Sequence, residues 1–331
     1  MIDAKHNHWR EWPVYRAITP KRVFLTFIAF VILSISAHNT EMDKAAIETS
    51  KAVLSTVGIG DSQVLDGVVR FASKAFPFQI SERTEVARID DFDLENLPWF
   101  SYIEAGELKE YDALEGKWTV EQTAYLVDPV GYLKKVIIKM WETIEMGFWG
   151  TLISVMISLP LGMLAAKNYA PHRLVYIVSR FWLSFHRAMP ELILALFLVL
   201  MYGFGPIAGV FALAIHTSGV LGKFFADEIE NAPTGPQLAL KSAGASSLKV
   251  LRYAVFPHVL PAWIAYVQYI FERNIRTATV LGIVGAGGIG MELKGRWDLF
   301  DYGHVSTILF VVFITVLALE YGSQKLRMKT L

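Results

Sequence analysis

The sequence contains no cysteine among its 331 residues. Disulfide bonds, thiolate metal sites and cysteine nucleophiles are therefore excluded. The chain also lacks an excess of charge of either sign, because 31 lysine and arginine residues balance 31 aspartate and glutamate residues. No basic surface points to a nucleic-acid partner.

Catalytic motifs are missing as well. The sequence has no GxxxxGK[ST] phosphate-binding loop, no HExxH and no GxSxG. The chain thus shows no site of its own for hydrolysing ATP, peptides or esters, and we expect no catalytic residue and no metal site. If ATP drives its function, another subunit must supply the hydrolysis.

One apparent nucleotide motif, Gly285-Ala-Gly287-Gly288-Ile-Gly290, matches GxGxxG. A dinucleotide-binding unit needs a helix and a second parallel strand after this motif. Only about forty residues remain, and their one long apolar run is predicted to be a membrane span. We interpret these glycines as a tight turn with close backbone approach rather than a nucleotide site.

Long apolar runs are what the sequence does have. Hydrophobic residues make up 53% of the chain and the mean hydropathy is +0.39, too apolar for an ordinary soluble enzyme. The runs reach or approach the length needed to cross a hydrocarbon core of about 30 Å. They cover residues 23–37, 146–166, 188–204, 207–226, 259–284 and 305–319. This pattern predicts an all-α membrane protein with six transmembrane helices.

The distribution of lysine and arginine predicts the orientation. Basic residues cluster before the first run, after the second run and in the tail, and the loop after the second run has no acidic residue. The three groups are Lys5, Arg10, Arg16, Lys21 and Arg22; Lys167, Arg173 and Arg180; and Lys325, Arg327 and Lys329. Six crossings place all three groups on one side, so we expect cytoplasmic N- and C-termini.

The same rule places residues 38–140 outside the cytoplasm. This region has an acidic excess, and helical periodicity over 45–54 and 64–75 predicts a mostly helical insertion. Asp91-Phe-Asp93-Leu-Glu95 resembles the start of a calcium loop, but Asn96 and Tyr102 replace the glycine and glutamate that such a loop needs. A solvated acidic face is the preferred interpretation. The first apolar run, short and ending in small residues, also fits a signal peptide.

Small residues recur every fourth position in the second run, at Gly150, Ser154, Ser158, Gly162 and Ala166. Such a stripe lets helix backbones approach closely in lipid, although chance enrichment in an apolar helix is the alternative. Either interpretation concerns packing rather than chemistry.

Charged groups near the middle of the fifth run predict a helix that lipid does not surround, and further polar groups lie in two other runs. Glu272 and Arg276 can pair at i,i+4, either as a purely internal salt bridge or at the border of an anion route. Arg187 and Glu191 form a second such pair around Pro190, where the helix is predicted to break or begin. The candidates for a translocation pathway are Arg187, Glu191, His216, Ser218, Glu272, Arg273 and Arg276.

A spacing pattern distinguishes the loop before the fifth run. Leu238-Ala239-Leu240 is followed after three residues by Gly244, and nine residues later by Ala254-Val-Phe256-Pro257. This resembles the EAA loop of ABC importer permeases, whose pattern is EAA, three residues, Gly, nine residues, I-x-L-P. The spacing fits fully, while Leu238, Leu240, Ala254 and Phe256 depart from the family's residues.

Three further segments, residues 187–199, 216–230 and 276–290, are similar to the phosphonate/phosphite branch of these permeases. The resemblance covers about residues 142–329 and leaves out the acidic external region. It implies a type I importer fold in the bacterial inner membrane. It also implies a second permease copy forming a homodimer, two ATP-binding subunits that bind ATP and Mg, and an extracytoplasmic substrate-binding protein. The chain itself would hold no cofactor.

The apolar runs and the charge distribution divide the chain into a cytoplasmic segment (1–22), a first transmembrane helix (23–37) and an extracytoplasmic region (38–140), and the resemblance implies a permease core (141–331). The core would contain five transmembrane helices and a cytoplasmic coupling loop (227–257). The residues implied to contact the ATPase are Leu238, Ala239, Leu240, Gly244, Ala245, Phe256 and Pro257.

The expected function is import of a phosphonate or phosphite oxyanion by alternating access. Two alternatives stay open. One is a permease of the same architecture for another small solute such as methionine. The other is a partner-independent channel or a scaffolding membrane protein.

Overall fold

The computed structural model describes residues 19–330, apart from 57, 59, 90–91, 95–96 and 113–116. It divides into two units, Met1–Ser73 and Lys74–Leu331, which we describe separately. The acidic segment Asp91–Glu95, interpreted as a solvated face, lies partly outside the described residues, and the basic residues before position 19 lie wholly outside them.

The first unit contains helices α1 (Pro20–Asn39) and α2 (Met42–Thr56) and most of α3 (Gln63–Ala75). Thr19 caps α1 by accepting a hydrogen bond from the Arg22 amide, and Pro20 occupies the first turn, where its missing N–H costs nothing. No residue of α1 is buried by the chain itself. An apolar helix of 20 residues, none of them buried, fits the predicted first membrane span.

The second unit begins with a three-stranded antiparallel sheet in the order β1-β3-β2. Its strands are β1 (Glu82–Glu85), β2 (Tyr102–Asp112) and β3 (Lys117–Asp128), with a single 3-10 turn, η1 (Val86–Arg88), after β1. Tyr102 pairs with Val127, and Glu82 pairs with Asp128 on the other edge of β3. The helices predicted at 45–54 and 64–75 are present, but the prediction of a mostly helical insertion is wrong, because it missed this sheet.

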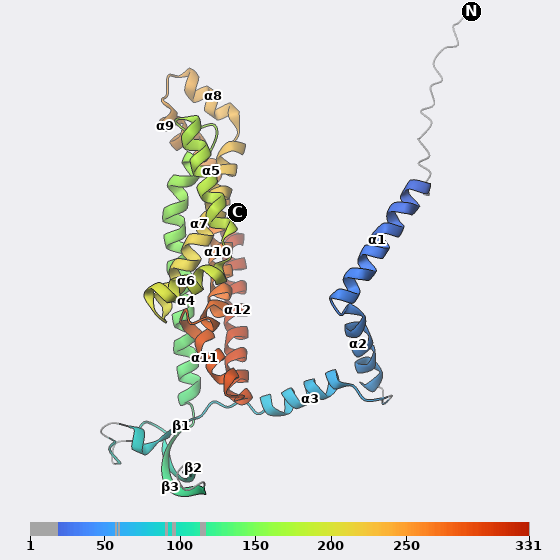
Figure 1. The fold of residues 1–331 in the computed structure, drawn as a ribbon. Helices are drawn as coiled ribbons and strands as arrows, with labels where there is room; N and C mark the ends of the chain where they lie inside the picture. Colours follow the sequence, from blue (N-terminus) through green and yellow to red (C-terminus); the bar gives the residue numbers. More distant parts are fainter. Residues whose placement is uncertain are drawn as a thin grey trace, which may run out of the picture. The chain divides into compact units, whose positions relative to one another are not determined.

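A helical bundle follows the sheet (Figure 1). Its elements are α4 (Gly131–Leu164), α5 (Arg173–Ala188), α6 (Glu191–Tyr202), α7 (Pro206–Asn231), α8 (Thr234–Ser242), α9 (Ser247–Val250), the π-helical turn η2 (Leu251–Val255), α10 (Phe256–Ile283), α11 (Gly288–Asp298) and α12 (Tyr302–Thr330). Figure 1 shows α8 and α9 at one end of the bundle and the sheet at the other. α12 runs from the sheet end toward the α8–α9 end.

Among the described residues, five helical stretches are long and apolar enough to cross a membrane. A sixth span results if α5 and α6, which meet at a bend of 87°, count as one broken span. The third span predicted over 188–204 is therefore shorter in the structure, and the break predicted at Pro190 is present. Its helix α6 has only 12 residues, about 18 Å, and the chain turns sharply before Pro190.

The small-residue stripe of α4 faces α7, as the packing interpretation requires. Ser154, Ser158 and Ala166 are fully buried. A Cβ added at Gly150 would lie 2.8 Å from Leu213 Cβ, and one at Gly162 would lie 3.0 Å from the Gly222 carbonyl oxygen. These two helices approach too closely for larger side chains on this face.

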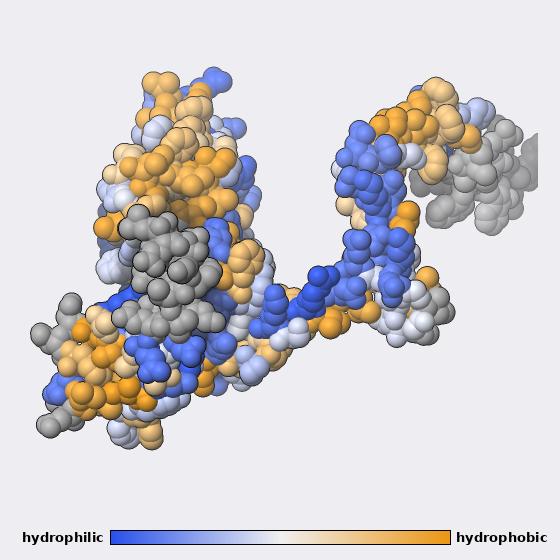
Figure 2. Space-filling model, turned by 60° about the horizontal axis from the view of Figure 1, so that its bottom comes forward, coloured by the Kyte–Doolittle hydropathy of each residue, from blue (hydrophilic) through white to orange (hydrophobic). Residues whose placement is uncertain are grey.

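Apolar side chains also cover the outside of the bundle. Figure 2 shows hydrophobic residues spread over its visible face. Large exposed apolar residues of α5 and α6 include Phe181, Phe197 and Leu200. Such a surface is suited to lipid or to neighbouring helices and is unlike that of a soluble monomer.

Candidate functional site

The loop with EAA-like spacing folds as a helical hairpin of α8 and α9. Gly244 ends α8 with a φ of +79°, a conformation that favours glycine. The amide of Gly244 donates to the Lys241 carbonyl and that of Ala245 to the Leu240 carbonyl, the two bonds of a Schellman turn. Pro257 lies in the first turn of α10, where proline is tolerated.

The outer surface of this hairpin region carries apolar side chains that the chain leaves uncovered. Leu238 is 60% exposed, Leu248 79% and Tyr253 64%. Ala239 is also exposed, whereas Leu240, Ala245 and Phe256 are half-buried. Exposed apolar groups beside a rigid turn are typical of a protein contact surface.

The inner side of the hairpin is fixed by Gln237, a residue that the sequence analysis did not single out. Gln237 is buried, and its Nε2 donates to the Ala232 and Pro233 carbonyls at 3.1 and 3.0 Å. Its Oε1 accepts a hydrogen bond of 2.8 Å from the Tyr169 hydroxyl, in the loop after α4. Burial raises the pKa of Tyr169, which keeps this hydroxyl protonated as a donor. The sequence signal that could have identified Gln237 is its position as a polar residue directly before Leu238, within the EAA-like pattern.

A cluster of ionisable groups lies within the bundle, where α6, α7 and α10 meet. Glu191 Oε1 accepts a hydrogen bond of 3.1 Å from Arg273 Nη2, and Glu191 Oε2 lies 2.9 Å from His216 Nε2. The other ring nitrogen of His216, Nδ1, lies 2.9 Å from the Met189 carbonyl oxygen. Glu191 begins α6, so its carboxylate also faces the positive end of that helix.

The predicted pairing of Arg187 with Glu191 is wrong. Arg187 is exposed near the end of α5, while Glu191 begins α6 beyond the 87° bend. The i,i+4 geometry requires a continuous helix, and the break at Met189–Pro190 removes it. Glu191 pairs with His216 and Arg273 instead.

The pair Glu272–Arg276 is present as predicted, with Arg276 Nη1 donating to Glu272 Oε1 at 2.7 Å. The helix α10 is continuous here, so the i,i+4 spacing holds. Glu272 is buried and Arg276 is partly exposed.

Ser218 lies outside this cluster, in the contact between α5 and α7. Its hydroxyl lies 2.8 Å from Nδ1 of the buried His186, and its carbonyl accepts a hydrogen bond of 3.0 Å from Ser158. A further buried chain links Thr217 to Asn274 at 3.1 Å and Asn274 to Thr151 at 2.9 Å. These polar groups satisfy one another between helices, as buried polar groups in membrane bundles do.

The glycine-rich segment before α11 is a close-packing site. Glu142 accepts a hydrogen bond from the Gly288 amide, and the Thr143 hydroxyl accepts one from the Ile289 amide. These contacts satisfy amides at the start of α11, the position where a helix N-terminus would otherwise attract an anion. The prediction that GxGxxG has a structural role here is consistent with this arrangement.

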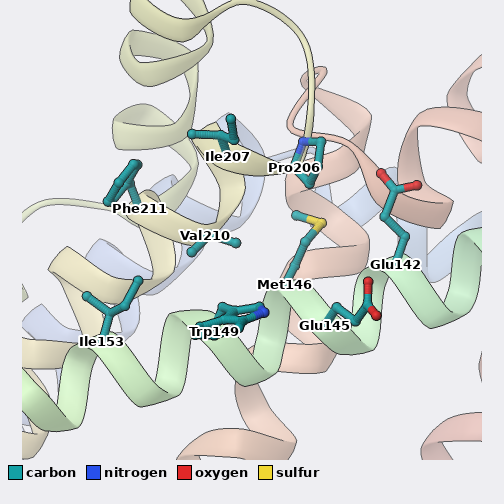
Figure 3. Close-up of a pocket in the computed structure, with 9 residues that line it drawn as sticks. All are labelled: Glu142, Glu145, Met146, Trp149, Ile153, Pro206, Ile207, Val210 and Phe211. Atoms are coloured by element: carbon teal, nitrogen blue, oxygen red, sulfur yellow. The ribbon is translucent and has the colours of Figure 1, made fainter.

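A groove of about 310 Å³ lies between α4 and α7 (Figure 3). Its lining is mainly apolar, with Met146, Trp149 and Val210 along it and Glu142 and Glu145 at one end. None of the residues predicted for the translocation pathway lines it. Its two carboxylates are engaged by Lys139, Gly288 and the indole of Trp141.

Comparison with known proteins identifies the family. Residues 158–321 match the family described as "Binding-protein-dependent transport system inner membrane component". HtxE of Stutzerimonas stutzeri is named as a putative permease protein of a phosphite transport system. This chain is 48% identical to HtxE over an alignment that covers 77% of this chain and 99% of HtxE. The chain belongs to this family. It is therefore a permease subunit of an ABC importer in the inner membrane, and the ATPase is a separate component.

Other relatives share shorter parts of the chain. PtxC of Stutzerimonas stutzeri, a phosphite transport system permease protein, is 42% identical over 56% of this chain and 68% of its own length. The phosphate-import permease protein PhnE of Mycolicibacterium smegmatis is 42% identical over 54% of this chain and 34% of its own length.

Solved structures agree on the fold. An inward-facing form of the MetNI methionine ABC transporter matches with a TM-score of 0.52 at 20% identity, over 59% of this chain and 96% of that one. An amino acid ABC transporter matches with a TM-score of 0.52 at 18% identity, over 60% of this chain and 96% of that one. Family membership also leaves no support for the alternative of a partner-independent channel or scaffold.

Proposed function

We propose that this permease carries phosphite or organophosphonate oxyanions into the cytoplasm by alternating access. The hairpin of α8 and α9 is the part that receives motion from an ATPase. The observation that carries this role is the rigid Schellman turn at Gly244 beside the exposed side chains of Leu238, Leu248 and Tyr253. A rigid hairpin with an exposed apolar surface can be bound by the ATPase and can transmit the movement of the ATPase to the membrane helices.

The cargo assignment rests on the relatives. HtxE and PtxC are named for phosphite transport, and the relative from Mycolicibacterium smegmatis is named for phosphate import. Inorganic phosphate is therefore the second candidate cargo. The methionine relatives are only 25% identical, which makes methionine a weaker candidate.

The assembly we propose contains two permease chains, two ATP-binding subunits and an extracytoplasmic binding protein. HtxE and HtxC are two different permeases from one organism, both named for phosphite transport and both similar to this chain. The second permease chain is thus either another copy of this chain or a related permease. Purification with two different affinity tags on this chain separates these cases, because only a homodimer retains both tags.

The test of the function is uptake by proteoliposomes that contain the full transporter and its binding protein. We expect ATP-dependent uptake of labelled phosphite or methylphosphonate, with phosphate as competitor and D-methionine without effect. Preferential uptake of D-methionine would reject the cargo assignment.

The test of the hairpin is Gly244→Val. A β-branched residue at φ +79° is strained by about 1–3 kcal/mol, so the turn would be distorted. We expect uptake to fall to background while the variant still inserts in the membrane. Gly235→Val, in the first turn of α8 with open space around it, is the matched control and should transport normally. Normal uptake by Gly244→Val would contradict the coupling role.

A further inference from the structure

A cavity of about 620 Å³ lies at the surface between the loop after α4 and the first turns of α5. Its lining contains basic, aromatic and apolar side chains and no acidic one: Lys167, Ala170, His172, Arg173, Tyr176 and Ile177. In the sequence, the basic residues of this loop indicate only the orientation of the chain. The fold brings two of them, Lys167 and Arg173, to one cavity.

The protein itself does not use these two cations. Within the described part of the chain, the side chains of Lys167 and Arg173 form no ion pair and no hydrogen bond, and both are exposed. Lys167 contributes only its backbone amide, which donates to Glu230 Oε1 at 2.6 Å. The carboxylates of Asp227 and Glu230 are both paired with Arg180. These three basic side chains and two carboxylates leave one positive charge for an anion.

The start of α5 does not supply this attraction. The Leu174 amide in the first turn donates to His172 Nδ1 at 3.1 Å, so His172 caps the helix with its own side chain. A ligand at this cavity therefore meets the side chains of Lys167 and Arg173 rather than a free helix end.

Exposed apolar side chains continue from the cavity along α5. Leu174 and Phe181 are 63% and 64% exposed, and Ile177 and Val178 between them are also exposed. The spacing of three and four residues places these side chains on one face, which we call the apolar stripe of α5. Ile177 belongs both to the stripe and to the cavity lining. The stripe is suited to contact with lipid chains, because α5 and α6 together form a candidate membrane span.

The cavity also lies at the depth of lipid headgroups. Helix α4, a candidate membrane span, ends at Leu164, and α5 begins at Arg173, so the loop between them marks a border of the apolar region. Basic pockets at such a border bind anionic lipid headgroups. A free phosphate ion would use the two cations but would leave the apolar stripe uncovered. The stripe therefore favours a lipid as the occupant.

We propose that this cavity binds an anionic phospholipid, with the phosphate held by Lys167 and Arg173 and the acyl chains lying along the apolar stripe of α5. The planar fork of the arginine can bind two phosphate oxygens, and the lysine adds a point charge. The same loop carries Tyr169, whose hydroxyl donates to Gln237 of the coupling hairpin at 2.8 Å. A bound lipid thus stabilises the loop on which the hairpin rests. This site goes beyond the proposed function and does not depend on the cargo.

The experiment uses the complete transporter, purified in detergent and supplied with equal amounts of phosphatidylglycerol and phosphatidylcholine. Native mass spectrometry counts the lipids that remain bound, and thermal unfolding is measured with each lipid alone. We expect the wild type to retain phosphatidylglycerol preferentially and to unfold at a higher temperature with it, because a ligand that binds the folded state stabilises that state. The double variant Lys167→Gln with Arg173→Gln should lose about tenfold or more of this preference, because each basic residue beside anionic lipid contributes roughly a fivefold preference.

The matched control is the double variant Lys21→Gln with Lys325→Gln. It removes two exposed charges from α1 and α12, also predicted to be cytoplasmic, and neither residue lines the cavity. We expect this control to keep the wild-type preference. Because Lys167 and Arg173 bond to no other described side chain, both double variants should unfold at the wild-type temperature in detergent without phospholipid. This comparison separates lipid binding from folding.

Three results would overturn the site. An unchanged preference in Lys167→Gln with Arg173→Gln would show that the two cations do not bind lipid. An equal loss in the control would show that the charges act only by general attraction to an anionic membrane. Displacement of phosphatidylglycerol from the wild type by inorganic phosphate would show that the acyl chains contribute nothing and that the occupant is a free anion.

Discussion

At the scale of single residues, what surrounds a position decides its importance more than the sequence motif does. The glycines of residues 285–290 match a nucleotide fingerprint, yet their neighbours are packed atoms of the same protein, which for Gly287 and Gly290 are backbone atoms. A Cβ added at Gly290 would lie 2.0 Å from the Thr279 carbonyl oxygen and 2.8 Å from Gly282 Cα. Gly295, five residues later on the same helix, has open space around it.

Gly290→Ala should therefore destabilise the permease, whereas Gly295→Ala should not. Backbone atoms cannot move aside as a flexible side chain can, so we expect a cost of about 1–3 kcal/mol from overpacking. The measurement is the thermal unfolding midpoint of each purified variant in detergent. Equal midpoints for the two variants would mean that α10 and α11 pack less tightly than the structure indicates.

Tyr169 offers a second residue-scale test, because its hydroxyl connects the coupling hairpin to the loop after α4. Tyr169→Phe leaves Gln237 Oε1 buried without this donor, which should cost about 1–3 kcal/mol. We expect fewer cargo molecules transported per ATP hydrolysed, measured by parallel uptake and phosphate-release assays. Tyr253→Phe, on an exposed ring near the same hairpin, is the control and should keep the wild-type ratio. A wild-type ratio in Tyr169→Phe would show that this bond does not serve coupling.

At the scale of helices and strands, local pattern predicted some elements and failed for others. Glu272–Arg276 was predictable because α10 is continuous through both residues. The partners of Glu191 were not predictable, because His216 and Arg273 come from helices far along the chain and only the folded bundle brings them together. The sheet was missed because strands β2 and β3 carry many polar residues and depend on each other for pairing.

Arg180 shows how one side chain joins three elements. In the sequence analysis, Arg180 served only as one of the basic residues that predict the orientation of the chain in the membrane. In the fold its Nη1 and Nη2 pair with Asp227 and Glu230 of α7 at 2.9 and 3.0 Å, and its Nε donates to the Ala165 carbonyl beyond α4 at 2.9 Å. It therefore holds the same end of α4, α5 and α7 together.

Arg180→Met should loosen this end of the bundle. The substitution keeps an unbranched stem but removes the cation that pairs with Asp227 and Glu230 and leaves Glu230 with the Lys167 amide, at a cost of about 1–3 kcal/mol for partly exposed groups. Arg173→Met, on the exposed start of the same helix, should change stability by less than about 0.5 kcal/mol. Thermal unfolding of both variants, with limited proteolysis of the loop after α4, provides the comparison. Equal stability would mean that the ion pairs of Arg180 contribute nothing measurable.

At the scale of the whole molecule, the proposed topology follows from the charge distribution and the number of crossings. Hairpin α8–α9 and the C-terminal end of α12 lie toward the same end of the second unit, and the sheet lies at the opposite end (Figure 1). This arrangement is consistent with a coupling hairpin and a C-terminus in the cytoplasm and a sheet outside it. The family and fold were predictable because apolar runs and the EAA-like spacing are local features. Pro190 likewise predicted a break between α5 and α6, whereas its angle of 87° depends on tertiary contacts.

The absence of cysteine makes this topology directly testable, since any cysteine introduced is the only one in the chain. We expect Ser50→Cys, on exposed α2, to react with a charged maleimide added to right-side-out vesicles, because that reagent does not cross the bilayer. Ser247→Cys, on exposed α9, should react only after the vesicles are permeabilised. Both substitutions replace one small side chain with another at the surface, so insertion should be unaffected. If Ser247→Cys reacted from outside, the coupling hairpin would face away from any cytoplasmic ATPase, and the proposed topology and mechanism would both be wrong.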